Sequence, residues 1–126
     1  MDISEKTEKY AVKSMYYLNN ASKSIDAGDS EKSSEFLWGS IAQALKAVAA
    51  SRGIALRNHR RIWDFADSLA KELEDKDIFD TFLHANYLHT NFYEAELEMK
   101  DVRRIAEDIK LTVGKLLPYI AGADEK

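Results

Sequence analysis

Residues that interrupt helices are rare in this chain. Its 126 residues include one proline and five glycines, and both residue types disfavour the interior of a helix. Their scarcity favours a few long helices over many short strands. A chain of this length also corresponds to one domain of ordinary size. We therefore expect a single all-α domain spanning residues 1–126, with a frayed tail over 121–126.

Apolar residues recur every three or four positions, the spacing of one helix face. The pattern predicts five helices, at about 4–27, 30–52, 58–74, 75–93 and 99–117. We expect Gly28 and Gly53 to follow helix ends, Asn58 to cap the third helix and Pro118 to end the fifth. Short connections between helices of this length predict an up-and-down bundle.

The predicted core faces follow from the same spacing. In the first helix the face comprises Val12, Met15, Tyr16 and Asn19. The second helix has the clearest face: Leu37, Ile41, Ala44, Leu45 and Val48. The later faces are Ile62, Phe65, Ala66 and Leu69, then Ile78, Phe82, Ala85 and His89, then Val102, Ile105, Ala106, Ile109, Val113 and Leu116. Trp38 and Trp63 are expected to anchor the core or an interface.

Several classes of protein are excluded by composition. The chain has no cysteine, so it has no disulfide framework, thiol nucleophile or zinc ribbon. His84 and His89 are five residues apart, which separates them by about 140° around a helix, so we expect no metal site. We find no dinucleotide or phosphate-loop motif and expect no cofactor. The polar N-terminal segment and the absence of a long apolar run predict a cytoplasmic protein outside the membrane.

The net charge of −4 argues against a dedicated duplex-binding module. One local cluster of basic side chains exists nevertheless, and it offers possible phosphate contacts: Arg52, Arg57, Arg60 and Arg61, with His59 among them. The simpler interpretation is a solvated loop and helix start. His59 has two interpretations of its own, as a residue that closes the start of a helix or as a general base.

The most unusual segment is LHANYLHTNFYEAE, residues 83–96. One interpretation places His89 in the core, bonded to a backbone carbonyl or to Tyr93. The alternative is a polar, ligand-binding pocket, for which the candidate residues are His59, His89, Asn91, Tyr93 and Glu94. The sequence leaves both interpretations open, and it designates no catalytic residue.

The run from Phe36 to Leu73, followed by LHTNFYE, resembles the archaeal PaREP-type family of the HEPN (higher eukaryote and prokaryote nucleotide-binding) superfamily. The similarity covers about residues 30–117. It implies a HEPN-like helical bundle that is often a homodimer. Members of the superfamily include ribonucleases of toxin and defence systems and companions of nucleotidyltransferases.

The ribonuclease members place an arginine four to six residues before a histidine on a late helix. In this chain His84 stands where that arginine is expected, ahead of His89. An imidazole cannot reproduce the fork of donors that a guanidinium offers to phosphate. Arg52 and His59 have the right spacing, but Gly53 separates them onto two earlier helices. Because the arginine of the ribonuclease motif is absent, the resemblance favours a protein without enzymatic activity.

Three hypotheses follow. The first is a dimerising module without catalysis of its own that binds a partner protein or a nucleotide. The second is a metal-independent ribonuclease, in which His59 or His89 acts as base and Arg57, Arg60 or Arg61 holds phosphate. The third is a nucleotide-binding companion of a separately encoded nucleotidyltransferase. A homodimer is thus the expected assembly, and the possible further partners are a nucleotidyltransferase or another protein, a nucleotide, or RNA.

Overall fold

The computed structural model describes residues 2–91 and 98–124, and these residues form α-helices joined by turns without any strand. The helices are α1 (Ile3–Asp26), α2 (Ser30–Ser51), α3 (His59–Glu72), α4 (Lys76–Asn91) and α5 (Met99–Asp124). The all-α prediction is confirmed. Among the described residues, no helix combines the length and the apolar character needed to cross a membrane.

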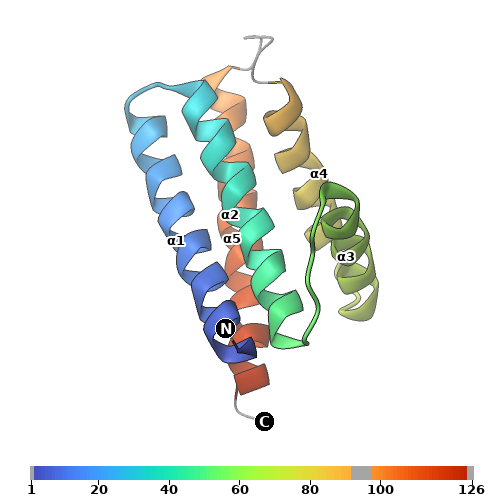
Figure 1. The fold of residues 1–126 in the computed structure, drawn as a ribbon. Helices are drawn as coiled ribbons and strands as arrows, with labels where there is room; N and C mark the ends of the chain where they lie inside the picture. The colour runs from blue at the N-terminus through green and yellow to red at the C-terminus, as the bar shows by residue number, and fades with distance from the viewer. Residues whose placement is uncertain (1, 92–97, 125–126) are drawn as a thin grey trace.

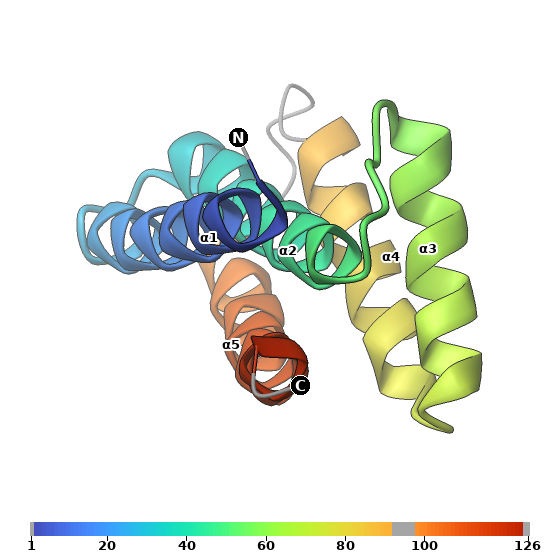
Figure 2. The ribbon, with the colours of Figure 1, turned by 60° about the horizontal axis from the view of Figure 1, so that its bottom comes forward.

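Helix α2 is the centre of the bundle, because it contacts each of the other four helices. Helices α1 and α2 form an antiparallel pair, and α5 packs against both (Figure 1). Helix α4 packs against α2 and α5, while α3 lies on the outer side of α4, away from α1 (Figure 2). The result is a bundle of α1, α2, α4 and α5 with α3 added along one side.

The predicted face of α2 forms the middle of the core. Its residues Leu37, Ile41, Ala44, Leu45 and Val48 are all fully buried. Alanines on the neighbouring positions, including Ala47 and Ala49, are buried as well. Small side chains let adjacent helices approach closely, which explains how α2 packs against partners on several sides.

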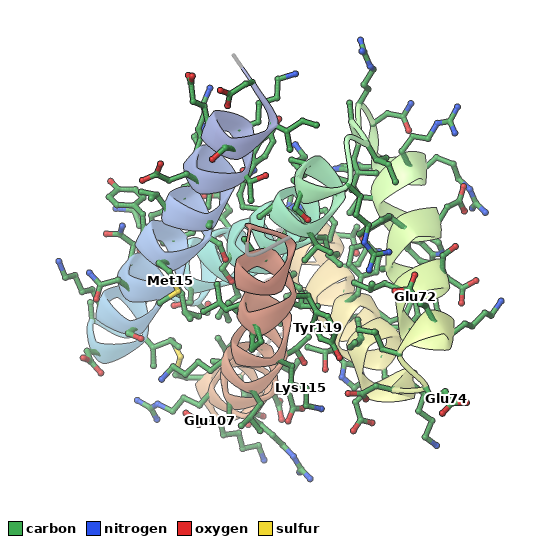
Figure 3. The ribbon with its side chains drawn as sticks, turned by 90° about the horizontal axis from the view of Figure 1, so that it is seen from below. Met15, Glu72, Glu74, Glu107, Lys115 and Tyr119 are labelled. Carbon is green, nitrogen blue, oxygen red and sulfur yellow. The ribbon has the colours of Figure 1, made fainter. Side chains whose placement is uncertain are left out.

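The predicted core face of α1 is wrong. Val12, Met15 and Tyr16 are 61%, 46% and 62% exposed, and Figure 3 labels Met15 on this helix. Helix α1 instead turns small residues toward α2: Thr7, Ser14, Ala21 and Ser24 are buried. The Ser14 hydroxyl donates a hydrogen bond of 2.7 Å to the backbone carbonyl of Ser40 on α2. Leu18 and Ile25, which lie on the same face as these small residues, are partly buried and pack against the core.

The predicted end of α5 at Pro118 is also wrong, because the helix continues to Asp124. A proline removes one backbone donor and leaves the carbonyl four residues earlier without its usual partner. That carbonyl belongs to Gly114, which is exposed, so water can hydrate it. Beyond the proline, Tyr119 (labelled in Figure 3) is 44% exposed. The next residue, Ile120, is buried.

The predicted helix boundaries at Gly28, Gly53 and Asn58 are confirmed. Both glycines have φ of 75°, a left-handed conformation that is easy for glycine. The Asn58 side chain accepts a hydrogen bond of 3.0 Å from the backbone N–H of Arg61, which caps the start of α3. From Ser51 the chain runs back alongside α2 before α3 begins (Figure 1). This path places the start of α3 beside the middle of α2.

Candidate functional site

The ring of Trp38 on α2 contacts one imidazole from each of two other helices. The indole of Trp38 is 8% exposed. The His89 imidazole stacks on it with ring centroids 5.1 Å apart and an interplanar angle of 22°. The His59 imidazole meets it edge-on at 5.5 Å and 82°. The two imidazoles are themselves 6.0 Å apart. We call Trp38, His59 and His89 the ring cluster.

The fold explains why these rings meet. His59 is the first residue of α3, and the returning connection brings that helix start to α2. His89 lies in the last turn of α4, and Phe82 lies on the same helix. The Phe82 ring lies 5.3 Å from Trp38 and 5.5 Å from Trp63. The aromatic core thus continues from α3 through α4 to the ring cluster.

The environment of His89 lowers its pKa below the ordinary value of 6.5. Burial is the largest cause, because it disfavours the charged imidazolium. The nearby His59 lowers the pKa further, while Glu35 opposes both effects. At neutral pH His89 is therefore an uncharged imidazole that can accept a proton.

We expect the stability of the protein to fall in mild acid because of His89. Below pH 6.5 the unfolded chain binds more protons than the folded chain, so unfolding is favoured as pH decreases. The stability linked to neutral His89 is complete above that value and is lost as pH falls through the lower pKa of the folded state. Denaturant unfolding between about pH 7 and pH 5 should show a shallower decline for His89→Gln than for wild type. His84→Gln provides the control, because His84 is an exposed histidine on the same helix.

An open cleft of about 620 Å³ lies beside the ring cluster, between α1, α2 and the start of α3. Trp38 and His59 form part of its wall. The other lining residues are Tyr17, Glu35, Phe36, Gly39, Ala42, Gln43, Lys46, Arg57, Asn58 and Ile62. The rings of Tyr17 and Phe36 are 6.2 Å apart and tilted by 31°. This cleft is of the size that ordinarily holds a small ligand.

Two features of the cleft wall suggest what it can hold. The Gln43 Oε1 atom is buried and, within the described part of the chain, has no hydrogen-bond partner. Lys46 and Arg57 place two cationic groups on the lining, against one carboxylate, that of Glu35. The cleft therefore combines aromatic surface and an excess of positive charge, and Gln43 adds an amide whose oxygen is buried without a partner.

The structure divides the predicted phosphate contacts. Arg57 lines the cleft. Arg52 lies at the end of α2 and forms a bidentate pair with Glu72, at 2.7 and 2.8 Å (Figure 3 labels Glu72). Arg60 pairs with Asp64 at 2.9 Å along α3. Arg61 lines a separate surface hollow that Arg57 shares. Of the four arginines, only Arg57 therefore faces the ring cluster's cleft.

The predicted pocket residues are likewise divided. His59 and His89 are brought together, although only His59 lines the cleft. The side chain of Asn91, and all of Tyr93 and Glu94, lie outside the described residues. His84 lines a different groove, between α4 and α5, beside Asp80 and Lys115. Among the residues that the structure describes, no group of histidines and acids is arranged to hold a metal ion.

Sequence reasoning missed the polar stripe on α2 that faces the cleft. Glu35, Gly39, Gln43 and Lys46 are spaced by four, four and three residues, so they share one face of the helix. A polar stripe within an alanine-rich, otherwise buried helix is the signal that identifies them. Tyr17 has no comparable signal, because its neighbour Tyr16 fits the helical spacing equally well.

The fold and the site define a helical-bundle protein with an aromatic, cation-lined cleft next to a pair of imidazoles. The sequence matches the archaeal PaREP1/PaREP8 family over residues 9–113, and the chain belongs to this family. No curated protein matches it, and no solved structure matches it.

Proposed function

We propose that the cleft binds a nucleotide and that the protein acts as a binding module rather than as an enzyme. The observation that carries the proposal is the buried Gln43 Oε1 without a partner in the cleft wall. A buried acceptor without a hydrogen bond costs about 1–3 kcal/mol. Because Oε1 is buried, the Gln43 side chain must turn toward the cleft before a ligand can donate an N–H to this atom; a ligand that does so recovers that free energy.

Aromatic side chains supply the surface for a base. Tyr17, Phe36 and Trp38 all contribute to the lining. Stacking of a base on an aromatic ring contributes about 1–3 kcal/mol per base and tolerates any base. Stacking therefore gives affinity here, while a directional hydrogen bond is needed to choose among bases.

The Gln43 amide provides that direction. A glutamine amide pairs with adenine by accepting from its exocyclic amino group and donating to the adjacent ring nitrogen. On the edge that carries N7, hypoxanthine has a carbonyl oxygen in place of the amino group, so it presents no donor to a glutamine amide that pairs there; its N1–H lies on the other edge. We therefore expect AMP to bind more tightly than IMP. The phosphate then lies toward Lys46 and Arg57, the two cations on the lining.

Calorimetric titration with AMP tests this proposal. Gln43→Met keeps the size of the side chain and removes the acceptor, and it should weaken AMP binding about tenfold, as expected for the loss of one buried hydrogen bond. The same change should leave IMP binding nearly unaltered. Arg57→Gln should also weaken AMP binding, whereas Arg61→Gln, exposed and outside the cleft, should not. Absence of any AMP binding at millimolar concentration would contradict the proposal.

A second function, cleavage of RNA, is favoured by the paired imidazoles. His59 and His89 lie 6.0 Å apart, and the lowered pKa of His89 leaves it able to accept a proton from a ribose hydroxyl. His59 would then donate a proton to the leaving oxygen. Incubation of the protein with RNA, beside His59→Ala and His89→Gln, tests this function. Cleavage that both changes leave intact would exclude the pair as its source.

Family resemblance in the sequence also leads us to propose a homodimer. The exposed apolar face of α1, which comprises Val12, Met15 and Tyr16, supports this proposal because solvent exposure of three adjacent large apolar side chains is unfavourable. Light scattering at micromolar concentration should give twice the mass of the chain. Val12→Lys with Tyr16→Lys should reduce it to the mass of one chain, while Lys13→Glu on the same helix should not. A single-chain mass for the wild type would refute the dimer.

A further inference from the structure

A second, smaller cavity of about 150 Å³ lies between the first turns of α1, the end of α2 and the connection that follows α2. One part of its lining is apolar, contributed by Ile3, Ile54 and Leu56. The polar part consists of Lys6, Tyr10 and Lys46. No carboxylate belongs to the described lining. We call this cavity the lysine pocket.

The lining of the lysine pocket selects an anion with a short hydrocarbon part. Two ammonium groups and a phenol hydroxyl are hydrogen-bond donors for a carboxylate, and the absence of an acid leaves their charge uncompensated within the pocket. A cavity of roughly 150 Å³ with apolar walls accommodates a molecule of about the size of benzene. Small aromatic or branched monocarboxylates combine both properties.

Lys46 connects the lysine pocket to the cleft beside the ring cluster, because it lines both cavities. Its Nζ atom lies 5.9 Å from the centroid of the Tyr10 ring, and Tyr10 lines the lysine pocket but not the cleft. A lysine has a flexible four-carbon stem, so one ammonium group can serve either cavity but not both. The connection after α2 is a shared wall: Leu56 lines the lysine pocket and Arg57 lines the cleft.

We infer that the lysine pocket binds a small monocarboxylate of about benzene's size and that this ligand and the nucleotide compete for Lys46. The competition rests on the proposed function of the cleft, whereas the carboxylate site does not. Each ligand must weaken the other by the same factor, because coupling between two binding sites is reciprocal. The pocket thus gives the cleft an inhibitory effector site.

Benzoate is the probe for the site itself, with benzamide as the uncharged control of equal size. Saturable benzoate binding, measured by NMR titration of the full chain, should weaken at least about fivefold in Lys6→Gln and in Lys46→Gln, because each change removes one ammonium group. Lys9→Gln is the matched control, since Lys9 is exposed on the same helix outside the pocket. Benzamide binding equal to that of benzoate, or benzoate binding unaffected by Lys6→Gln, would overturn the site.

Titration of AMP with and without saturating benzoate tests the competition. Benzoate should raise the apparent Kd for AMP several-fold in the wild type and leave it unchanged in Lys46→Gln. If both ligands bind and neither alters the affinity of the other, the competition is overturned. If AMP does not bind while benzoate binding depends on Lys6, the proposed function of the cleft fails and the lysine pocket stands.

Discussion

Trp38→Ala is expected to lower the free energy of unfolding by about 3–5 kcal/mol, the usual cost of removing a buried tryptophan. The indole is 8% exposed and contacts Phe82, His59 and His89. These neighbours come from α3 and α4, so they cannot collapse together into the space that the indole leaves. Trp38 also lines the open cleft, however, so water can enter part of the space that the indole leaves, and the cost should lie toward the lower part of that range.

Trp63→Ala provides the matched comparison. Trp63 contacts the same Phe82 ring, at 5.5 Å compared with 5.3 Å for Trp38, but it is only half-buried at the edge of the bundle. Its removal leaves a site that water can fill, so the loss should be clearly smaller. Denaturant unfolding followed by far-ultraviolet circular dichroism measures both variants without relying on tryptophan emission. Equal losses of unfolding free energy in the two variants would show that the ring cluster stabilises the core no more than the contacts of Trp63 do.

The sequence predicts the fold well where apolar residues occupy a single face. In α2 the face that includes Leu37, Ile41 and Leu45 is unambiguous, and all three residues are buried. Helix α1 is different because its buried face mixes small residues such as Ser14 and Ala21 with the partly buried Leu18 and Ile25. The spacing of Val12 and Tyr16 favours one face, yet a second face has the same spacing and packs against the core: Ala11, Ser14, Leu18, Ala21 and Ile25. Helical spacing records where apolar residues lie but not how near the partner helix can come.

The candidate site was predictable only in part. The sequence indicates His59 and His89 as unusual residues, but not that they meet, because their distance depends on the path of the chain between Ser51 and the start of α3. That segment has no regular structure from which its direction follows. The cleft beside them is formed largely by α2, and there the stripe of Gln43 and Lys46 was available in the spacing of polar residues. Tertiary packing, rather than local pattern, decides which polar stripe faces a cleft and which faces water.

Gly39→Val is expected to lower the free energy of unfolding by about 1–3 kcal/mol, the usual cost of overpacking, and to abolish the AMP binding proposed for the cleft. A Cβ atom at Gly39 would lie 2.8 Å from Cδ2 of Tyr17, closer than two non-bonded carbon atoms normally approach. The Tyr17 ring must therefore move, and it lines the cleft. Helix propensity acts in the opposite direction, because valine is better than glycine inside a helix by a few tenths of a kcal/mol.

Gly114→Val isolates the effect of propensity, since a Cβ atom at this helical position has no neighbour within 4 Å. It should leave stability nearly unchanged. The double variant Gly39→Val with Tyr17→Ala removes both atoms of the clash, so its stability should exceed the value expected from adding the two single losses. Urea unfolding and AMP titration of all four variants measure both properties. If Gly39→Val and Gly114→Val have the same effects on stability and AMP binding, the position of the Tyr17 ring does not depend on the absence of a side chain at Gly39. Another contact then sets the width of the cleft. If the loss of stability in the double variant equals the sum of the two single losses, the effects of Gly39 and Tyr17 are independent. The close approach of the Tyr17 ring to α2 then does not shape the wall on which the base is proposed to stack.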